Sequence, residues 1–471
     1  MRRSSFLRIR ELFEGGAGRA KDKQSVPIRE EPSISSTAND DKKAQQSTMI
    51  KGPFHPHALV WTCSNSNNND AKGFDWTGHV CDYCFSSIQL EGWHCTEPEC
   101  GTDVCGKCLP RDEKSRNGSS RLESPLQGHE HHLEWNSFPD NDAKCSACEA
   151  STRSIGSWDC RTCETSTTSL NRFVLCNDCR IAKEAVNPIE MGISLRLLRR
   201  LSGIFHDQSV VDELCSVIKD RTKQDEGYRS FAMNLFRHPL TRRFVQPRAD
   251  VFVSYAWKGR VKATMEALCS QLLPASGDND DEDVFIWMDV AIVDQHRAAE
   301  TNVDFDEWAK TFKGNLLKTK KAVLVLTPGR SPIAVSRSWC CFEWVCIVQS
   351  GIPFEYCVNP NDARELIFMA KNGLLRANFF ANILARINIE RATAFKEFDQ
   401  RAILGMMRET GVVKVNDIIM NSIKQWLMAV MQTAQEEARA ESNDVQLAEI
   451  LIGKGQLHYE LVSSCFHRLV V

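Results

Sequence analysis

The cysteines and histidines of the N-terminal part are the first residues to consider, because their types and spacing are those of metal ligands. The chain has 471 residues and 20 cysteines, and 13 of these cysteines lie between Cys63 and Cys179, many as Cys-x2-Cys pairs. The N-terminal stretch MRRSSFLRIRELF lacks the apolar segment of a secretory signal, so we expect a cytoplasmic protein. In such a protein this spacing favours metal-bound thiolates over disulfides.

These residues fall into two modules with the same order of parts: a His-x-His pair, a Cys-x2-Cys pair, a Trp-x-Cys element with one further cysteine, and a second Cys-x2-Cys pair. The first module contains His55, His57, Cys81, Cys84, Cys95, Cys100, Cys105 and Cys108. The second contains His129, His131, Cys145, Cys148, Cys160, Cys163, Cys176 and Cys179. Each set is enough for two closed tetrahedral zinc sites, so the sequence predicts about four zinc ions that hold structure and perform no chemistry.

Interleaved pairing fits this order best. We predict one site from the two Cys-x2-Cys pairs of each module and a second site from the remaining two histidines and two cysteines. The order resembles the cysteine/histidine-rich treble-clef domains of plants, relatives of the phorbol-ester zinc domains, in which the His-x-His pair leads. The runs CDYC, GWHC and DVCGKC followed by HEHHLEW also resemble ZZ-type zinc fingers, in which the His-x-His pair trails. The two assignments compete for His129 and His131. The assignment with a leading His-x-His pair is preferred, because the trailing one gives His55 and His57 no role.

Both resemblances imply the same kind of task. Closed zinc sites build a surface, so we expect the modules to recognise a protein or peptide, a modified protein tail or a lipid headgroup.

A second chemical signal is Glu343, which lies in the otherwise apolar run SRSWCCFEWV of residues 336–345. An ionised carboxylate in apolar surroundings is costly, so such a residue is turned to water, paired, or kept for its altered chemistry. At helical spacing Glu343 shares a face with Ser336, Trp339, Cys340 and Ile347, and this setting predicts a raised pKa.

Four short apolar runs indicate the elements that must position Glu343. They are DVFVSY (250–255), VFIWM (284–288), AVLVL (322–326) and FEYCV (354–358), and helix-like segments separate them. Continuous apolar strands that alternate with helices predict an α/β fold with a doubly wound parallel sheet covered on both faces.

Residues 248–360 resemble the TIR (Toll/interleukin-1 receptor) domain, which is flavodoxin-like. The resemblance rests on RADVFVSYAW, VFIWMD, KAVLVLTPG and SRSWCCFEW, and the last of these matches the W-C-x-x-E pattern of plant-type TIR domains. In TIR domains that cleave NAD the glutamate of this pattern is catalytic, which implies Glu343 as the catalytic residue, with Tyr255, Trp257 and the 290–304 loop around the nucleotide. The resemblance also implies self-association, and it leaves open a noncatalytic scaffold or adaptor.

The remaining segments complete a domain plan for an intracellular signalling protein. We predict a disordered segment at 1–50, zinc modules at 51–118 and 119–182, a helical linker at 183–247, the TIR-like domain at 248–360 and a helical extension at 361–471. Asp294 and His296 either assist the reaction or lie in a solvated loop. A net charge of −3 gives no reason to expect nucleic-acid binding, and no apolar run is long enough to predict a transmembrane segment.

Overall fold

The computed structural model divides into two compact parts, residues 1–183 and residues 184–471. The residues that the structure describes are 49–50, 59–63, 79–89, 91–95, 102–106, 108–109, 133–136, 144–149, 152, 157–160, 173–184, 186–225, 227–274, 283–300 and 305–469.

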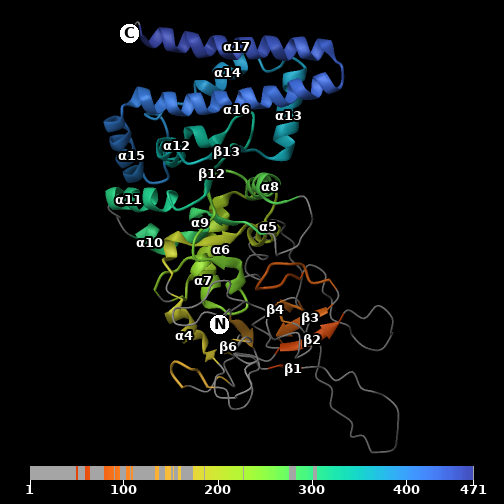
Figure 1. The fold of residues 1–471 in the computed structure, drawn as a ribbon, viewed down its shortest axis with the longest axis vertical. Coiled ribbons are helices and arrows are strands. Elements are labelled where there is room, and N and C mark those ends of the chain that lie inside the picture. Colours follow the sequence, from red (N-terminus) through yellow and green to blue (C-terminus); the bar gives the residue numbers. More distant parts are fainter. Residues whose placement is uncertain are drawn as a thin grey trace, which may run out of the picture. The chain divides into compact units, whose positions relative to one another are not determined.

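The first part holds one small antiparallel sheet in each cysteine module (Figure 1). Strands β1 (Met49–Ile50), β2 (Leu59–Cys63), β3 (Glu91–Cys95) and β4 (Asp103–Cys105) pair in chain order. Strands β5 (Glu134–Asn136), β6 (Ser157–Asp159) and β7 (Val174–Leu175) form the second sheet, and helix α4 (Asn177–Lys183) follows it. Trp93, Trp135 and Trp158 are buried in these sheets. Cores this small usually need a further support such as a metal ion.

The second part is built on a six-stranded sheet with the order β13-β12-β10-β11-β8-β9. Strands β10 (Val251–Ser254), β11 (Phe285–Trp287), β12 (Lys321–Val325) and β13 (Phe354–Cys357) are parallel and coincide with the four runs that the sequence analysis selected. The parallel strands and the alternation with helices are therefore confirmed.

The sheet is mixed, however, and not purely parallel as predicted. Strands β8 (Gly192–Ser194) and β9 (Val245–Gln246) add an antiparallel pair beside β11, and both come from the segment predicted as a helical linker. Strands of two or three residues are too short to show the alternation of apolar and polar residues that indicates a strand. The helical pattern on either side therefore led to the prediction of a helical segment. Gly192 is needed at this edge, because a Cβ there would lie 2.8 Å from the Cα of Ala249.

The described helices between residues 195 and 350 are α5 (Leu195–Ser202), α6 (Val211–Thr222), α7 (Phe231–Arg237), α8 (Val261–Leu272), α9 (Asp289–Ile292), α10 (Gln295–Glu300), α11 (Phe305–Leu316) and α12 (Ser338–Ser350). Helix α12 carries the SWCCFEW run and buries eight of its side chains. It ends at Gly351, which has the left-handed φ of 67° that favours glycine after a helix.

An aromatic cluster fixes α12 relative to the sheet. Phe252 of β10 stacks on Trp287 of β11 with ring centroids 5.1 Å apart. Phe312 of α11 packs edge-on against Phe252 at 5.3 Å and also contacts Phe342 of α12 at 5.5 Å. Because these four rings come from two strands and two helices, the cluster sets the position of Glu343, the residue next to Phe342.

The C-terminal extension is helical, as predicted. It contains α13 (Pro360–Lys371), α14 (Ala377–Leu384), α15 (Glu397–Thr410), α16 (Val412–Ala440) and α17 (Asp444–Leu469). The two long helices α16 and α17 pack side by side (Figure 1). The extension also packs on α12, where the indole of Trp339 donates a hydrogen bond of 3.2 Å to Asp399 of α15.

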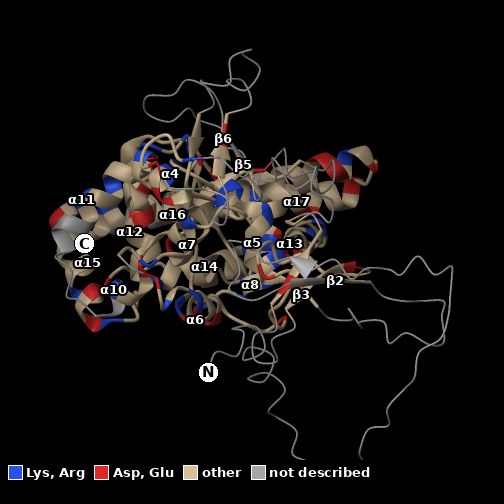
Figure 2. Ribbon diagram, turned by 90° about the horizontal axis from the view of Figure 1, so that it is seen from below, with Lys and Arg blue, Asp and Glu red and all other residues tan. Residues whose placement is uncertain are grey.

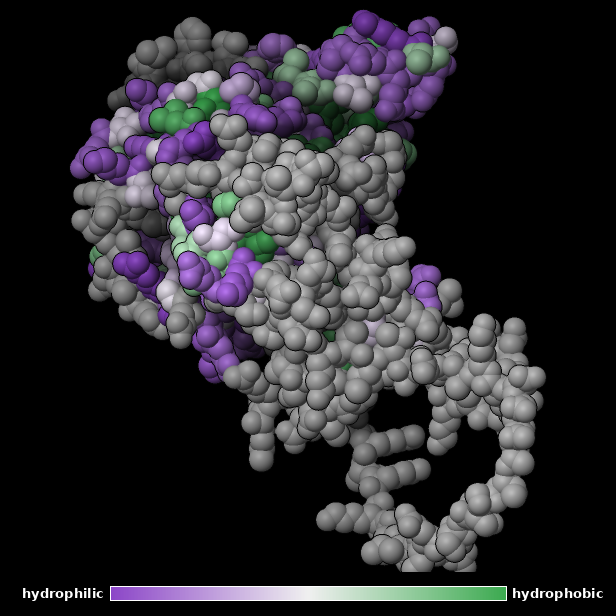
Figure 3. Space-filling model, turned by 60° about the horizontal axis from the view of Figure 1, so that its bottom comes forward, coloured by the Kyte–Doolittle hydropathy of each residue, from purple (hydrophilic) through white to green (hydrophobic). Residues whose placement is uncertain are grey.

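The described surface is mixed in charge and polarity. Basic and acidic residues are interspersed over the labelled helices in Figure 2, in keeping with a net charge of −3. In Figure 3 hydrophilic residues cover much of the visible described surface, with smaller hydrophobic patches between them. No helix among the described residues combines the length and the apolar composition needed to cross a bilayer.

Candidate functional site

Four cysteines of the first module meet in one group. Cys81 and Cys84 flank a turn before β3, Cys105 ends β4, and Cys108 follows three residues later. Their Sγ atoms all lie within 4.8 Å of one another, and those of Cys84 and Cys105 are 3.6 Å apart. All four side chains are buried. The structure thus brings together the four cysteines that the spacing places in one site.

The second module forms an equivalent four-cysteine group. Cys145, Cys148, Cys176 and Cys179 also have their Sγ atoms within 4.8 Å of one another. The Sγ atoms of Cys148 and Cys176 are 3.8 Å apart. This group is closer to solvent, since Cys148 is exposed and Cys179 is half-buried.

The two modules share a backbone pattern around their cysteines. In all four Cys-x2-Cys pairs the N–H of the residue after the pair donates to the carbonyl of its first cysteine, at 2.8 to 3.0 Å: Phe85 to Cys81, Leu109 to Cys105, Glu149 to Cys145 and Arg180 to Cys176. Phe85 and Glu149 occupy the same place in the two modules and both have a left-handed φ, of 59° and 60°. The sequence repeat is therefore also a structural repeat.

A second shared feature braces the two Cys-x2-Cys pairs of each module against one another. The Asp82 carboxylate accepts the N–H of Asp103 at 2.8 Å, and the Asp82 N–H donates to the Asp103 carbonyl at 2.9 Å. In the second module the hydroxyl of Ser146 accepts the N–H of Val174 at 3.0 Å, and the Ser146 N–H donates to the Val174 carbonyl at 2.7 Å. In both modules these hydrogen bonds join the residue that follows the first cysteine of the group to the residue two positions before the third cysteine.

The geometry of both groups fits a tetrahedral thiolate-bound metal ion. A zinc–sulfur distance of about 2.3 Å in a tetrahedron implies a sulfur–sulfur separation of about 3.8 Å, close to the separations found here. Thiolates are the form that binds metal. Each four-cysteine group could therefore hold one metal ion.

The second predicted site of each module remains a prediction. Cys95 and Cys160 are buried, and their backbone N–H groups donate to Thr102 and Phe173 in equivalent positions. The other six ligands of these sites lie outside the described residues: His55, His57, Cys100, His129, His131 and Cys163.

A cluster that the sequence analysis missed lies beside the four-cysteine group of the first module. The buried carboxylate of Asp103 accepts hydrogen bonds from the Nδ1 atoms of His79, at 2.6 Å, and His94, at 2.7 Å. Asp103 also takes part in the brace with Asp82, so the cluster continues the support of the cysteine pairs. The register of β3 with β4 places His94 opposite Asp103, and the sequence shows no sign of that pairing.

The second candidate site lies in the 184–471 part, around Glu343 in the second turn of α12. The hydroxyl of Ser254, the last residue of β10, donates a hydrogen bond of 2.7 Å to Oε2 of Glu343. Cys340 and Ile347 are buried on the same helix. Ser336 does not share this face as predicted, because it belongs to a 3-10 turn (Ile333–Ser336) that ends before α12 begins.

A second carboxylate, Asp289, lies at the start of α9, soon after β11. Its oxygens accept hydrogen bonds from the Tyr255 hydroxyl, from the Trp257 indole at 2.9 Å and from the Val290 N–H at 2.7 Å. Tyr255 is only 5% exposed. The two aromatic residues expected beside a nucleotide therefore hold Asp289 in this structure. Asp289 was not among the predicted site residues, although it is the acid that ends the buried apolar run VFIWMD.

Burial raises the pKa values of both carboxyl groups. Burial raises the pKa of Glu343 well above its ordinary value, the charge of Asp289 raises it further, and the Ser254 hydrogen bond opposes both effects. The pKa of Asp289 is also raised, because burial outweighs the hydrogen bonds from Tyr255, Trp257 and Val290. Burial thus opposes the ionisation of both carboxyl groups, and their hydrogen-bond donors favour it.

Both carboxyl groups lie at the edge where an open α/β sheet binds ligands. Strand β10 lies between β11 and β12, so the chain connections leave it in opposite directions. In such sheets a crevice forms outside the carboxyl ends of the strands at this reversal point. Ser254 ends β10 and Asp289 follows β11, so the arrangement can place two acids against a ligand at that edge.

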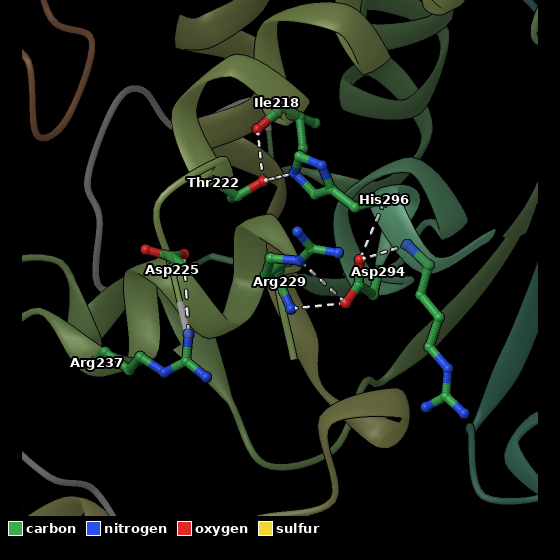
Figure 4. A network of polar contacts seen from close by, with 8 residues as sticks. Ile218, Thr222, Asp225, Arg229, Arg237, Asp294 and His296 are labelled. Atoms are coloured by element: carbon green, nitrogen blue, oxygen red, sulfur yellow. Dashed lines mark hydrogen bonds and ion pairs between the residues drawn. The ribbon is translucent and has the colours of Figure 1, made fainter. Parts of the chain in front are cut away.

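Asp294 and His296 do not lie in a solvated loop. Asp294 is 4% exposed, and its carboxylate accepts the N–H groups of Arg229, His296 and Arg297 at 2.9 to 3.0 Å (Figure 4). The ring of His296 hydrogen-bonds the Thr222 hydroxyl of α6 at 3.0 Å. Asp294 thus caps the N-terminus of α10. Asp294 and His296 together attach the segment after β11 to α6 and to the residues before α7.

No family model, curated protein or solved structure matches the chain.

Proposed function

We propose that the 184–471 part cleaves the N-glycosidic bond between nicotinamide and ribose in NAD, with Glu343 as the catalytic carboxylate. The observation that carries the proposal is the place of Glu343, which Ser254 holds at the carboxyl end of β10, beside a second acid. Acids with strongly shifted pKa values at such an edge are candidates for catalysis. The resemblance of SRSWCCFEW to the TIR pattern supports the same assignment.

The proposed reaction needs one ionised carboxylate and no acid. The bond between ribose C1′ and the pyridinium nitrogen breaks, and its electron pair stays on the nitrogen, so nicotinamide leaves as a neutral molecule. The ribose then carries an oxocarbenium-like charge, which ionised Glu343 stabilises or traps. Water adds to C1′ and releases a proton, which gives ADP-ribose. The buried side chains of Cys340 and Ile347 limit the access of competing water to the carboxylate.

We further propose that the four-cysteine groups hold zinc and that the modules they support recognise a protein or peptide, a modified tail or a lipid headgroup. The closed sets of four thiols support this role, because they leave no position for a reacting water. Self-association of the TIR-like part would then convert recognition into an intracellular signal.

A noncatalytic scaffold is the second candidate, and one observation favours it. Tyr255 is buried and its hydroxyl donates a hydrogen bond to Asp289, so both polar groups already have a partner within the chain and need no ligand. In that case Glu343 is a core carboxyl paired with Ser254, and the domain acts through assembly alone.

Free nicotinamide distinguishes the two candidates. The purified full chain is incubated with NAD at high concentration and as a forced oligomer, because TIR-like pockets are expected to depend on assembly, and nicotinamide is measured by chromatography. The matched control is Glu365→Gln, which removes a half-exposed carboxylate of α13 that pairs with Arg330. Nicotinamide released equally by wild type and control supports cleavage, and a forced oligomer that releases none supports the scaffold.

A further inference from the structure

A cavity of about 720 Å³ lies where α5, α8 and the start of α13 meet. Helix α8 packs against both α5 and α13 (Figure 1). The described lining of this cavity contains none of the residues that surround Glu343. Its volume is much larger than a single ion and falls in the range of pockets that hold small organic molecules.

Two arginines of α5 line the cavity. Arg196 and Arg199 are three positions apart, so they lie on the same face of the helix. Arg196 is only 4% exposed, whereas Arg199 is exposed and reaches solvent at the opening. A guanidinium group presents a planar set of N–H donors that matches the oxygens of a phosphate or a carboxylate. Two such groups in one wall indicate an anionic ligand.

The start of α13 adds a third positive element. Asn359 is buried and caps this helix, because its side-chain oxygen accepts the N–H of Asn361 at 2.9 Å. Asn359, Pro360 and Asn361 all line the cavity. The N-terminal end of a helix carries a partial positive charge, so the beginning of this twelve-residue helix favours an anion beside it.

Two carboxylates lie close to these positive groups. Glu266 of α8 lines the cavity and accepts a hydrogen bond of 2.6 Å from the amide of Asn359. Asp283 lies outside the described lining, where burial raises its pKa and the charge of Arg196 opposes that rise. The described lining itself therefore carries two full positive charges, those of Arg196 and Arg199, against the one negative charge of Glu266.

The rest of the wall contains apolar and neutral groups. Leu273, Pro274 and Pro360 supply apolar surface. Burial raises the pKa of the Cys269 thiol to about 12, so this group is neutral at pH 7 and adds no charge. A ligand that fills the cavity therefore needs an uncharged part as well as an anionic group.

We propose that this cavity binds a small organic molecule through a phosphate group, which lies between the two arginines of α5 and the start of α13, while the apolar wall contacts the rest of the molecule. A phosphate fits better than a carboxylate, because it carries about two negative charges and has more oxygens to share among these donors. The proposal concerns a site other than Glu343 and does not depend on the cleavage of NAD.

Calorimetric titration of the purified full chain with phenyl phosphate tests the proposal, because this probe joins a phosphate group to a small apolar ring. We expect it to bind more tightly than inorganic phosphate, which lacks the ring, and than benzoate, which has a carboxylate in place of the phosphate. Equal affinity for phenyl phosphate and inorganic phosphate would overturn the role of the apolar wall. Benzoate that binds as tightly as phenyl phosphate would overturn the choice of a phosphate group.

Two variants with opposite effects assign the binding to this cavity. Arg199→Gln should weaken the binding of phenyl phosphate by about tenfold or more, because a charged donor is lost, and the exposure of Arg199 makes the change compatible with folding. Glu266→Gln should strengthen binding by about two- to fivefold, because it removes the negative charge while its oxygen still accepts the Asn359 amide.

The matched control is Arg408→Gln, which removes an exposed arginine of α15 that pairs with Glu390 and should leave the affinity unchanged. Glu343→Gln should also bind phenyl phosphate as tightly as the wild type, whether or not the wild type releases nicotinamide. Loss of binding in Glu343→Gln would place the probe at the other site and overturn the proposal. Absence of binding by the wild type, or an unchanged affinity in both Arg199→Gln and Glu266→Gln, would overturn it as well.

Discussion

The hydroxyl of Ser254 lies 2.7 Å from the carboxylate of Glu343, although the two residues are 89 positions apart in the sequence. One ends a central strand and the other lies in the second turn of α12, and the packed rings of Phe252, Trp287, Phe312 and Phe342 hold these elements together. This hydrogen bond is the one described contact that favours the ionised form of Glu343.

Ser254→Ala should shift the pH dependence of nicotinamide release. The Ser254 hydrogen bond lowers the pKa of Glu343, so its loss raises that pKa further and moves the rise of activity to higher pH. The measurement is the pH profile of kcat/KM for the wild type and the variant. Ser270→Ala, which removes a hydroxyl bonded to a carbonyl within α8, is the control and should leave the profile in place. An unshifted profile for Ser254→Ala would mean that the hydrogen bond does not tune Glu343.

Glu343→Gln should change how stability depends on pH. The pKa of Glu343 is raised in the folded state, so its contribution to stability is fully present below its unfolded pKa of about 4.5 and is lost as pH rises toward the folded pKa. One retained proton gives a loss of up to about 1.4 kcal/mol per pH unit over that window. The glutamine variant lacks this loss, so its free energy of unfolding should increase relative to that of the wild type as pH rises.

That comparison can be made by urea titration, with the amide exchange of α12 peptides read by mass spectrometry at each pH. The difference between variant and wild type is the informative quantity, because the other titrating groups cancel. A constant difference across the pH window would contradict the raised pKa.

The zinc content tests the metal assignment. Elemental analysis of the purified chain should give about four zinc ions, and the double change Cys84→Ser with Cys105→Ser should remove one of them. The double change His55→Ala with His57→Ala should remove one more if the leading histidines are ligands, whereas a loss only with His129→Ala would favour the ZZ-like arrangement.

Cys215→Ser is the control for zinc content, because it changes a buried cysteine of α6 outside both four-cysteine groups. It should leave the number of bound zinc ions unchanged. Two or fewer zinc ions in the unmodified chain would exclude the predicted histidine-containing sites.

Chelation should unfold the first part and spare the second. Both four-cysteine groups lie within residues 1–183, and the parallel strands lie within residues 184–471. We expect a chelator to abolish the amide protection of β3 and β6, while β10 and β12 keep theirs. Simultaneous loss of protection in all four strands would show that the parts do not fold independently.

Much of this arrangement was open to prediction, because it depends on local signals. The Cys-x2-Cys spacing located both four-cysteine groups, and four apolar runs located the parallel strands. The antiparallel strands β8 and β9 could not be found in this way, because two or three residues carry no periodicity. Asp289 was missed for a related reason: its donors Tyr255 and Trp257 lie more than thirty positions earlier, and only the pairing of β10 with β11 brings them together.

The repeat also contains features that spacing alone does not show. The left-handed residues Phe85 and Glu149 and the braces at Asp82 and Ser146 occupy matching positions with different side chains. Equivalent backbone geometry is therefore kept where the side chains differ.

The ratio of kcat/KM between wild type and Glu343→Gln, measured as nicotinamide release from NAD by the forced oligomer, tests the central claim most directly. Glutamine keeps the volume of the side chain but cannot stabilise a ribosyl cation by charge. We therefore expect a loss of at least about a hundredfold, the scale for removing one well-placed electrostatic group, with zinc content and amide protection unchanged. Equal release by the variant and the wild type, or no release by the wild-type oligomer, would contradict the catalytic role of Glu343.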